Sequence, residues 1–234
     1  MNEILSKYLS AAGLEASAEK LEKYMDLVLE YNEKVNLTAI KDRDGFAVKN
    51  IIDSLSVSSA DSYRKSGRII DVGTGAGLPG IPLAVISPDK EFVLMDSLGK
   101  RVKIVNEIAA ELGLGNVTAV HFRAEDMAHD EEYREKFDMC VSRAVSQLNV
   151  LAEYCLPFVK KGGYFVSYKG DSFAEEAHDA VNALKILGGK LESVDSGLMK
   201  NYGLDHALLF IKKEKQTPSK YPRKAGTPKR NPLR

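Results

Sequence analysis

The spacing of hydrophobic residues divides the chain into an all-helical beginning and a longer part in which strands and helices alternate. In the first part the clearest helix begins after Ser17, which is placed as an N-cap. Its apolar residues recur at helical spacing, at Leu21, Tyr24, Met25, Val28 and Leu29. A second helix is predicted across residues 46–60. We therefore expect residues 1–60 to form a helical cap in front of the rest of the fold.

From residue 68 onward, short β-rich runs are separated by helical stretches. Five such runs span residues 68–72, 92–96, 117–122, 137–142 and 164–169. This alternation is typical of a parallel sheet with helices on both faces. Two later runs, 191–196 and 206–213, have no convincing helix between them and are expected to form an antiparallel hairpin at the edge. The pattern predicts an α/β fold with a seven-stranded, mostly parallel sheet in a core over residues 61–213.

A glycine-rich stretch follows the first predicted strand directly. Its sequence GAGLPG, residues 75–80, satisfies the dinucleotide-binding pattern GxGxxG. Gly73, Gly75 and Gly77 let the chain turn sharply and let a ligand approach the backbone closely. Ligands of open α/β sheets bind at the carboxyl ends of the strands, where this loop lies. The loop therefore predicts a nucleoside-type ligand. The simpler alternative is a turn that needs glycines and binds nothing.

Two acidic residues at strand ends help to distinguish between nucleoside ligands. Asp71 ends the first strand, where a carboxylate would repel the pyrophosphate of NAD. It suits S-adenosylmethionine, which has an α-ammonium group, a sulfonium and no phosphate. Asp96 ends the second strand, where an acidic side chain accepts hydrogen bonds from ribose hydroxyls in either kind of enzyme. The residues favour S-adenosylmethionine, with an NAD-dependent oxidoreductase as the alternative.

Composition narrows the class of protein further. The chain has 234 residues, 44% of them hydrophobic and 28% charged, which is ordinary for a soluble globular protein. No apolar run approaches the roughly 20 residues that span a bilayer. Cys140 and Cys155 have no metal-ligand spacing. We expect a cytoplasmic monomer with reduced thiols, no metal site and no membrane contact.

Charge is distributed unevenly along the chain. The formal net charge is zero, but residues 212–234 contain nine Lys or Arg side chains and one Glu. Four of the eight prolines lie in the same stretch, so residues 214–234 are predicted to be an extended basic tail rather than a helix. Such a tail suits an RNA backbone, with Tyr221 available for stacking, and we expect it to leave cofactor binding to the core. A solvated, disordered C-terminus is the alternative.

Several longer stretches together are similar to one protein family. They are residues 31–40, 71–84, 95–101, 122–126, 137–145 and 221–233. From about residue 20 to the C-terminus, and in the family's order, these motifs resemble the RsmG (GidB) family of bacterial 16S rRNA guanine-N7 methyltransferases. The resemblance implies a class I methyltransferase (Rossmann-like) sheet behind an N-terminal helical cap. It also implies S-adenosylmethionine as cofactor and 16S rRNA of the small ribosomal subunit as partner.

Strand ends, the glycine loop and the resemblance together define the candidate site residues. The expected cofactor-binding residues are Asp71, Gly73, Thr74, Gly75, Gly77, Leu78, Asp96, Ser97, Ala124, Glu125 and Arg143. The expected RNA-binding residues are Arg123, Lys169, Lys220, Arg223, Lys224, Lys229 and Arg230. For Arg123 and Arg143, a surface ion pair with Glu125 or Asp126 is the structural alternative. The chain departs from the family's usual residues at Thr74, Leu78, Asn50 and His206.

The chemistry of guanine N7 explains why no catalytic acid or base is expected. N7 already carries an exposed lone pair, so the enzyme can work mainly by positioning the reactants, with Arg123 and Lys169 as the candidates for holding the guanine. The chain has neither an Asn-Pro-Pro-Tyr-like motif nor a Pro-Cys after the fourth predicted strand. Exocyclic-amine and cytosine-C5 methyltransferases use those motifs. A non-catalytic RNA-binding or ribosome-assembly factor on a methyltransferase core remains a second alternative, because of the basic tail and of Asn50 and His206.

Overall fold

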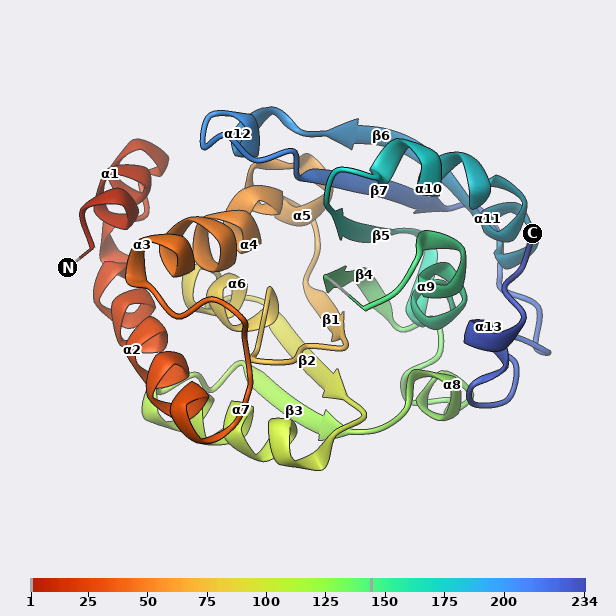
Figure 1. The fold of residues 1–234 in the computed structure, drawn as a ribbon. Coiled ribbons are helices and arrows are strands. Elements are labelled where there is room, and N and C mark those ends of the chain that lie inside the picture. The colour runs from red at the N-terminus through yellow and green to blue at the C-terminus, as the bar shows by residue number, and fades with distance from the viewer. Residues whose placement is uncertain (1, 144) are drawn as a thin grey trace.

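A single seven-stranded sheet organises the protein (Figure 1). The computed structural model describes residues 2–143 and 145–234, and its strands lie in the order β3-β2-β1-β4-β5-β7-β6. The strands are β1 (Arg68–Val72), β2 (Glu91–Asp96), β3 (Val117–His121), β4 (Phe137–Arg143), β5 (Val159–Lys169), β6 (Gly189–Asp195) and β7 (Ala207–Lys213). The first five pair in parallel, whereas β7 runs antiparallel to both β5 and β6. The predicted sheet and its antiparallel edge are confirmed.

Helices cover both faces of the sheet. The α-helices are α1 (Glu3–Ala12), α2 (Ala18–Lys34), α3 (Arg43–Phe46), α4 (Asp53–Leu55), α5 (Asp61–Arg64), α6 (Gly80–Ile86), α7 (Gly99–Glu111), α8 (Ala124–Met127), α9 (Leu148–Cys155), α10 (Phe173–Asp179), α11 (Val181–Leu187), α12 (Gly197–Lys200) and α13 (Thr227–Arg230). A π-helix, η2 (Ala47–Ile52), and three 3-10 turns, η1 (Glu15–Ser17), η3 (Ser56–Ser59) and η4 (Leu156–Phe158), complete the set. Figure 1 shows the cap helices on one side of the sheet and α9 and α11 on the other.

Alternate residues of the central strands belong to two separate hydrophobic clusters. Ile69 packs with the cap helices, α6 and α7, while its neighbour Ile70 packs with α8, α9 and α11. Leu94 and Val93 divide in the same way on β2. Because side chains of a strand point alternately to opposite faces, a sheet covered on both faces has apolar residues at neighbouring positions along its strands. This explains why the runs that predicted the strands are mostly apolar and do not alternate with polar residues.

The cap is joined to the sheet through one continuous core. α1 begins after Asn2, whose side chain accepts a hydrogen bond from Leu5 N, and it ends at Gly13 in the left-handed conformation. In α2, the fully buried Tyr24 donates its hydroxyl to the carbonyl oxygen of Ala76, 3.1 Å away in the glycine loop. The cap therefore contacts the loop that follows β1.

The predicted helix over residues 46–60 is instead a succession of π-, α- and 3-10-helical turns.

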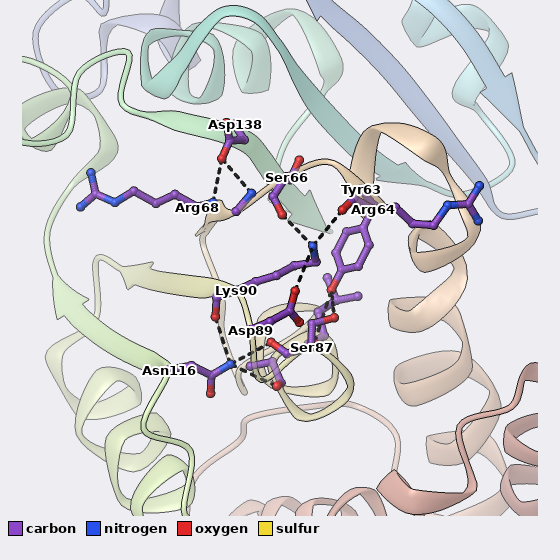
Figure 2. A network of polar contacts seen from close by, with 12 residues as sticks. Tyr63, Arg64, Ser66, Arg68, Ser87, Asp89, Lys90, Asn116 and Asp138 are labelled. Atoms are coloured by element: carbon purple, nitrogen blue, oxygen red, sulfur yellow. Dashed lines mark hydrogen bonds and ion pairs between the residues drawn. The ribbon is translucent and has the colours of Figure 1, made fainter.

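Polar contacts close the amino-terminal edge of the sheet, opposite the glycine loop (Figure 2). Lys90 is almost buried, and its Nζ donates to the carbonyl oxygens of Arg64 and Ser66 at 3.1 and 2.7 Å. Asn116 donates to three backbone carbonyls, including that of Lys90. The Asp138 carboxylate accepts the backbone N–H of Arg68 at 2.8 Å. These groups satisfy one another, which leaves the carboxyl-terminal edge as the place for a ligand.

The segment after β7 departs from the exposed tail that its composition predicts. It packs along α9, and its residues Thr227–Arg230 form the short helix α13 (Figure 1). Tyr221 is only 7% exposed and belongs to the hydrophobic cluster around α9, so it is not available for stacking on a base. The Arg134 guanidinium donates to the carbonyl oxygens of Tyr221 and Thr217. Apart from α13 the segment has no helix or strand, as its composition predicts, but the expectation that Tyr221 stacks on RNA was wrong because this side chain is buried against the core.

Candidate active site

Three glycines shape the loop between β1 and α6. Gly73, Gly75 and Gly77 have φ angles of 77°, 59° and 94°, a left-handed region that side chains with a Cβ rarely adopt. The N–H of Gly73 donates to the carbonyl oxygen of Met95 at 2.9 Å, which ties the loop to β2. A Cβ at Gly73 would lie 2.5 Å from Cγ2 of Val145. The glycines are therefore required both by the turn and by the close approach of a neighbouring segment.

Asp71 lies beneath the glycine loop and has no exposed surface. Its Oδ2 accepts hydrogen bonds from the Thr74 hydroxyl at 2.6 Å and from the Gly80 N–H at 2.9 Å. Its Oδ1 has no hydrogen-bond partner among the described residues. Burial raises the pKa of this carboxyl group to about 7, and the two donated hydrogen bonds only partly offset that rise. The side chain thus holds the loop and the start of α6 together.

A cleft of about 420 Å³ opens at the carboxyl ends of the strands, beside the glycine loop. Seven of the predicted site residues line it, namely Gly73, Asp96, Ser97, Arg123, Ala124, Glu125 and Lys229, the last of which was predicted to bind RNA. Arg101, Phe122, Val145 and Tyr154 also line it and were not predicted to have a role there. Residues from four strand ends and from the C-terminal segment therefore meet around one hollow.

Asp96 joins the second strand to the glycine loop. Its Oδ2 accepts the N–H of Gly75 at 3.0 Å and its Oδ1 accepts the N–H of Leu98 at 2.9 Å. The guanidinium of Arg101 lies 3.6 Å from Oδ2. A carboxylate oxygen can accept more than one hydrogen bond, so this side chain can also accept hydroxyl groups of a ligand in the cleft. The position agrees with the ribose-binding role that was predicted for it.

A second hollow, of about 550 Å³, adjoins the first at Val145 and Ser146, which line both. Arg143 lies here rather than in the first cleft. Its guanidinium donates to the Lys49 carbonyl oxygen at 2.7 Å and to the Asn50 side-chain oxygen at 2.9 Å. The same group makes an ion pair with the carboxylate of Asp53 in the cap. Arg143 therefore connects the end of β4 to the cap.

Asp53 is the buried carboxylate at the centre of that connection. Its Oδ2 lies 3.1 Å from Nη1 of Arg143, and its Oδ1 lies 3.2 Å from Nδ1 of His206. The hydrogen bond to Asp53 raises the pKa of His206, against the opposing effect of burial. Asn50 and His206 are two of the four positions at which the sequence departs from the family's usual residues. Both contact the Asp53–Arg143 ion pair and line the second hollow.

Lys169 also lines the second hollow, but its ammonium group is already engaged. Its Nζ donates to the carbonyl oxygen of Ser146 and to Oε2 of Glu176, both at 2.6 Å. By contrast, Arg123 is exposed at the rim of the first cleft. Of the two residues predicted to hold the guanine, only Arg123 has an exposed side chain that is free to reorient toward a substrate.

The remaining predicted residues take other places. Asp71, which was predicted to contact the cofactor, is buried beneath the glycine loop and lines neither hollow. Thr74, Gly75, Gly77 and Leu78 form the body of the loop and also line neither hollow. Among the predicted RNA-binding cations, Lys220, Lys224, Lys229 and Arg230 are exposed, whereas Arg223 is paired with a buried glutamate. Tyr154 and Val145 were missed as site residues. For Val145 the signal was its place directly after the SRA motif in the sequence.

Within residues 2–143 and 145–234, no helix is both long enough and apolar enough to cross a membrane. Within the same ranges, no three His, Cys, Asp or Glu side chains come together in an arrangement that could bind a metal ion.

Solved structures with the same architecture define the class of protein. The chain is similar to a putative O-methyltransferase from Klebsiella pneumoniae, with a TM-score of 0.55 at 14% identity over 82% of this chain and 90% of that one. It is also similar to the O-methyltransferase of a trans-AT PKS multienzyme of Brevibacillus brevis, solved in complex with S-adenosyl-L-homocysteine. That match has a TM-score of 0.52 at 12% identity and covers 71% and 72% of the two chains. The fold is that of the class I methyltransferases.

Sequence comparison identifies the family within that class. The family model described as rRNA small subunit methyltransferase G (GidB) matches residues 17–204. The "Ribosomal RNA small subunit methyltransferase G" of Alkaliphilus oremlandii (strain OhILAs) is 50% identical over 220 residues, which are 94% of this chain and 92% of that protein. The chain belongs to the rRNA small subunit methyltransferase G family. It is an S-adenosylmethionine-dependent methyltransferase, as the motifs predicted. Neither the NAD-dependent oxidoreductase nor the non-catalytic factor is favoured.

The residues of the first cleft fit this cofactor. Gly73 and Val145 both line the cleft, and Gly73 has no side chain that would take up space in it. Asp96 presents a carboxylate with acceptor capacity to spare, and the hollow is large enough for a ligand of nucleoside size. Gly73, Asp96, Ser97, Ala124 and Glu125 are the residues that would hold S-adenosylmethionine.

Proposed function

We propose that this methyltransferase transfers a methyl group to N7 of a guanine in the 16S rRNA of the small ribosomal subunit. The observation that carries the proposal is the pair of adjoining hollows, which share Val145 and Ser146, in a chain of the rRNA small subunit methyltransferase G family. The first hollow suits the cofactor, and the second suits the acceptor base. Bound S-adenosylmethionine supplies an electrophilic methyl group on a sulfonium.

The acidic side chains of the second hollow support a reaction without a general base. Asp53 is paired with Arg143 and His206, and Glu176 is paired with Lys169. The oxygens of these carboxylates are engaged by cationic partners of the protein itself, and an acceptor nitrogen that already has a lone pair does not require a base. These residues then act by positioning the base, which can contribute roughly 7–11 kcal/mol to lowering the barrier.

Exposed cations around the two hollows support RNA as the substrate. Arg123 stands at the rim of the first cleft, and Lys224, Lys229 and Arg230 are exposed on the nearby C-terminal segment. Lys and Arg side chains contact the phosphate backbone and give binding that weakens as salt is raised. We further propose that the chain works as a monomer in the cytoplasm, where ribosomal subunits assemble.

The experiment is methylation of ribosomal substrates followed by mapping of the modified base. The purified chain and S-adenosylmethionine are incubated with small subunits, or with protein-free 16S rRNA, from a strain that lacks its own enzyme of this family. Mass spectrometry of nuclease digests is expected to show a single 7-methylguanosine in at least one of the two substrates. A methyl group on another atom or base, or none in either substrate, would overturn the proposal.

Two aspartate variants provide a matched comparison in the same assay. Asp96→Asn removes the charge that lines the cofactor cleft and is expected to lower methylation at least tenfold. Asp89→Asn changes an exposed aspartate at the opposite edge of the sheet and is expected to leave methylation unchanged. Equal activity of the two variants would show that the first cleft is not the cofactor site.

A further inference from the structure

The segment of residues 214–234, here called the C-terminal strap, is anchored to the core where it leaves β7. Lys213 is fully buried, and its Nζ donates to the Leu156 carbonyl oxygen at 2.6 Å and to the Thr217 hydroxyl at 2.7 Å. The same ammonium group lies 3.0 Å from a carboxylate oxygen of Glu135. A little further along, the Arg134 guanidinium donates to three of the strap's backbone carbonyls, those of Thr217, Pro218 and Tyr221. The first half of the strap is therefore a fixed part of the fold.

A buried ion pair fixes the middle of the strap to α9. Glu153 is 0% exposed, and both of its carboxylate oxygens accept hydrogen bonds from the Arg223 side chain, at 2.9 Å from Nε and 2.7 Å from Nη2. The backbone N–H of Arg223 donates to the same carboxylate at 2.8 Å. A two-pronged arginine contact of this kind has a defined geometry, and a buried carboxylate that lost it would be left unpaired at high cost.

Beyond this ion pair the strap reaches the cofactor cleft. Gly226 has a φ of 79°, and its N–H donates to Oε1 of Glu125 at 2.9 Å. Glu125 is only 7% exposed and lines the cleft. Three residues later along the strap, Lys229 lines the same cleft. The strap thus supplies both a lining side chain and the hydrogen bond that orients a lining carboxylate.

We propose that the C-terminal strap is one wall of the cofactor cleft, with Gly226 as the positioning residue for Glu125 and Lys229 as a direct lining residue. The proposal rests on the proposed function, because Glu125 is expected to lie against the adenine of the cofactor. The Gly226 N–H fixes one carboxylate oxygen, and the other is then directed at the ligand. Cofactor binding consequently depends on the strap. The sequence analysis had instead assigned cofactor binding to the core alone.

Two substitutions at Gly226 test the hydrogen bond together with the backbone conformation that directs it. Gly226→Asn keeps the N–H, and asparagine tolerates the left-handed conformation better than most residues. A Cβ at this position meets no atom within 4 Å. Gly226→Pro removes the N–H and cannot adopt the native φ. The second pair is Lys229→Ala, which removes a side chain at the cleft, and Lys215→Ala, which removes an exposed one at the start of the strap.

The measurement is the dissociation constant for S-adenosylhomocysteine, by titration calorimetry on the full chain. We expect Gly226→Pro to weaken binding about tenfold and Lys229→Ala several-fold, with Gly226→Asn and Lys215→Ala within about twofold of the wild type. The affinities for S-adenosylhomocysteine and for its deaminated analogue, S-inosylhomocysteine, provide a second readout. Their ratio is expected to fall toward one in Gly226→Pro, because a carboxylate that is no longer oriented cannot distinguish the two bases.

The outcomes separate the two proposals. If the wild type does not bind S-adenosylhomocysteine, the proposed function and this inference both fail. If the wild type binds it and Gly226→Pro binds as tightly as Gly226→Asn, only the role of the strap is refuted. Thermal unfolding followed by circular dichroism shows whether Gly226→Pro remains folded. If it does not, Lys229→Ala decides the question, and an affinity equal to that of Lys215→Ala overturns the inference.

Discussion

Replacing Asp71 by asparagine tests the buried carboxyl group on which the glycine loop rests. In the folded protein its pKa is raised to about 7 from an ordinary value of 3.8, mainly because burial disfavours the charged form. The oxygen that accepts from Thr74 and Gly80 can be replaced by an amide oxygen of the same shape. Asp71→Asn therefore removes the titration and keeps both hydrogen bonds.

The sign and size of the effect follow from proton linkage. Between about pH 4 and pH 7 the folded state holds a proton on Asp71 that the unfolded state has released. The free energy of unfolding therefore contains a contribution that is complete below about pH 4 and is lost as the pH rises through about 7. At about 1.4 kcal/mol per pH unit, the full contribution is about 4 kcal/mol.

The assay is urea unfolding of the wild type and of D71N at several pH values from about 5 to about 8. The free energy of unfolding of the wild type, relative to that of D71N, is expected to fall by about 3 kcal/mol over this range. The comparison with D71N cancels the contributions of the other titrating groups. Parallel curves for the two proteins would show that Asp71 is ionised in the folded state. That result would refute the inference that burial keeps this carboxyl group protonated beneath the glycine loop.

Gly73→Ala places a Cβ 2.5 Å from Val145 at a φ of 77°. We therefore expect S-adenosylhomocysteine to bind at least tenfold more weakly in calorimetry, and an unchanged affinity would contradict the close approach of Val145 to the loop. Tyr24→Phe deletes the hydrogen bond to Ala76 and should lower the free energy of unfolding by about 1–2 kcal/mol in urea, whereas no loss would mean that this contact does not tie the cap to the loop. The pKa of His206 is raised by its carboxylate partner, so the pair stabilises the protein below the ordinary pKa of 6.5 and less so as the pH rises through the raised value. His206→Gln should lose this pH dependence of the free energy of unfolding. Identical pH profiles for the wild type and the variant would show that the Asp53–His206 pair does not contribute it.

Hydrophobic periodicity was sufficient to predict the sheet. Each central strand is buried on both faces, so most of its residues are apolar, and the run stands out from the helices around it. The start of β5 was placed too late, at residue 164 rather than Val159, because two lysines and two glycines interrupt the apolar pattern there. The glycine loop was recognised because its residue types are required locally by the turn.

Pairings between distant charges could not be predicted in the same way. Arg143 was expected near the cofactor, but the fold brings the cap against the end of β4 and pairs it with Asp53. The C-terminal segment has the composition of a disordered tail, yet Arg223 meets the buried carboxylate of Glu153 on α9. Such contacts depend on where the chain places residues far apart in sequence, and composition carries no information about that placement.

The order of residues by itself determined which elements form, where the glycine loop lies and which family the chain belongs to. These features are local, since they depend on periodicity and on residue types within a few positions of one another. Only the tertiary structure decided that Asp71 supports the loop from below and that the last residues of the chain border the cofactor cleft. Burial and charge pairing are properties of neighbours in space, and those neighbours exist only once the sheet, the cap and the strap have packed together.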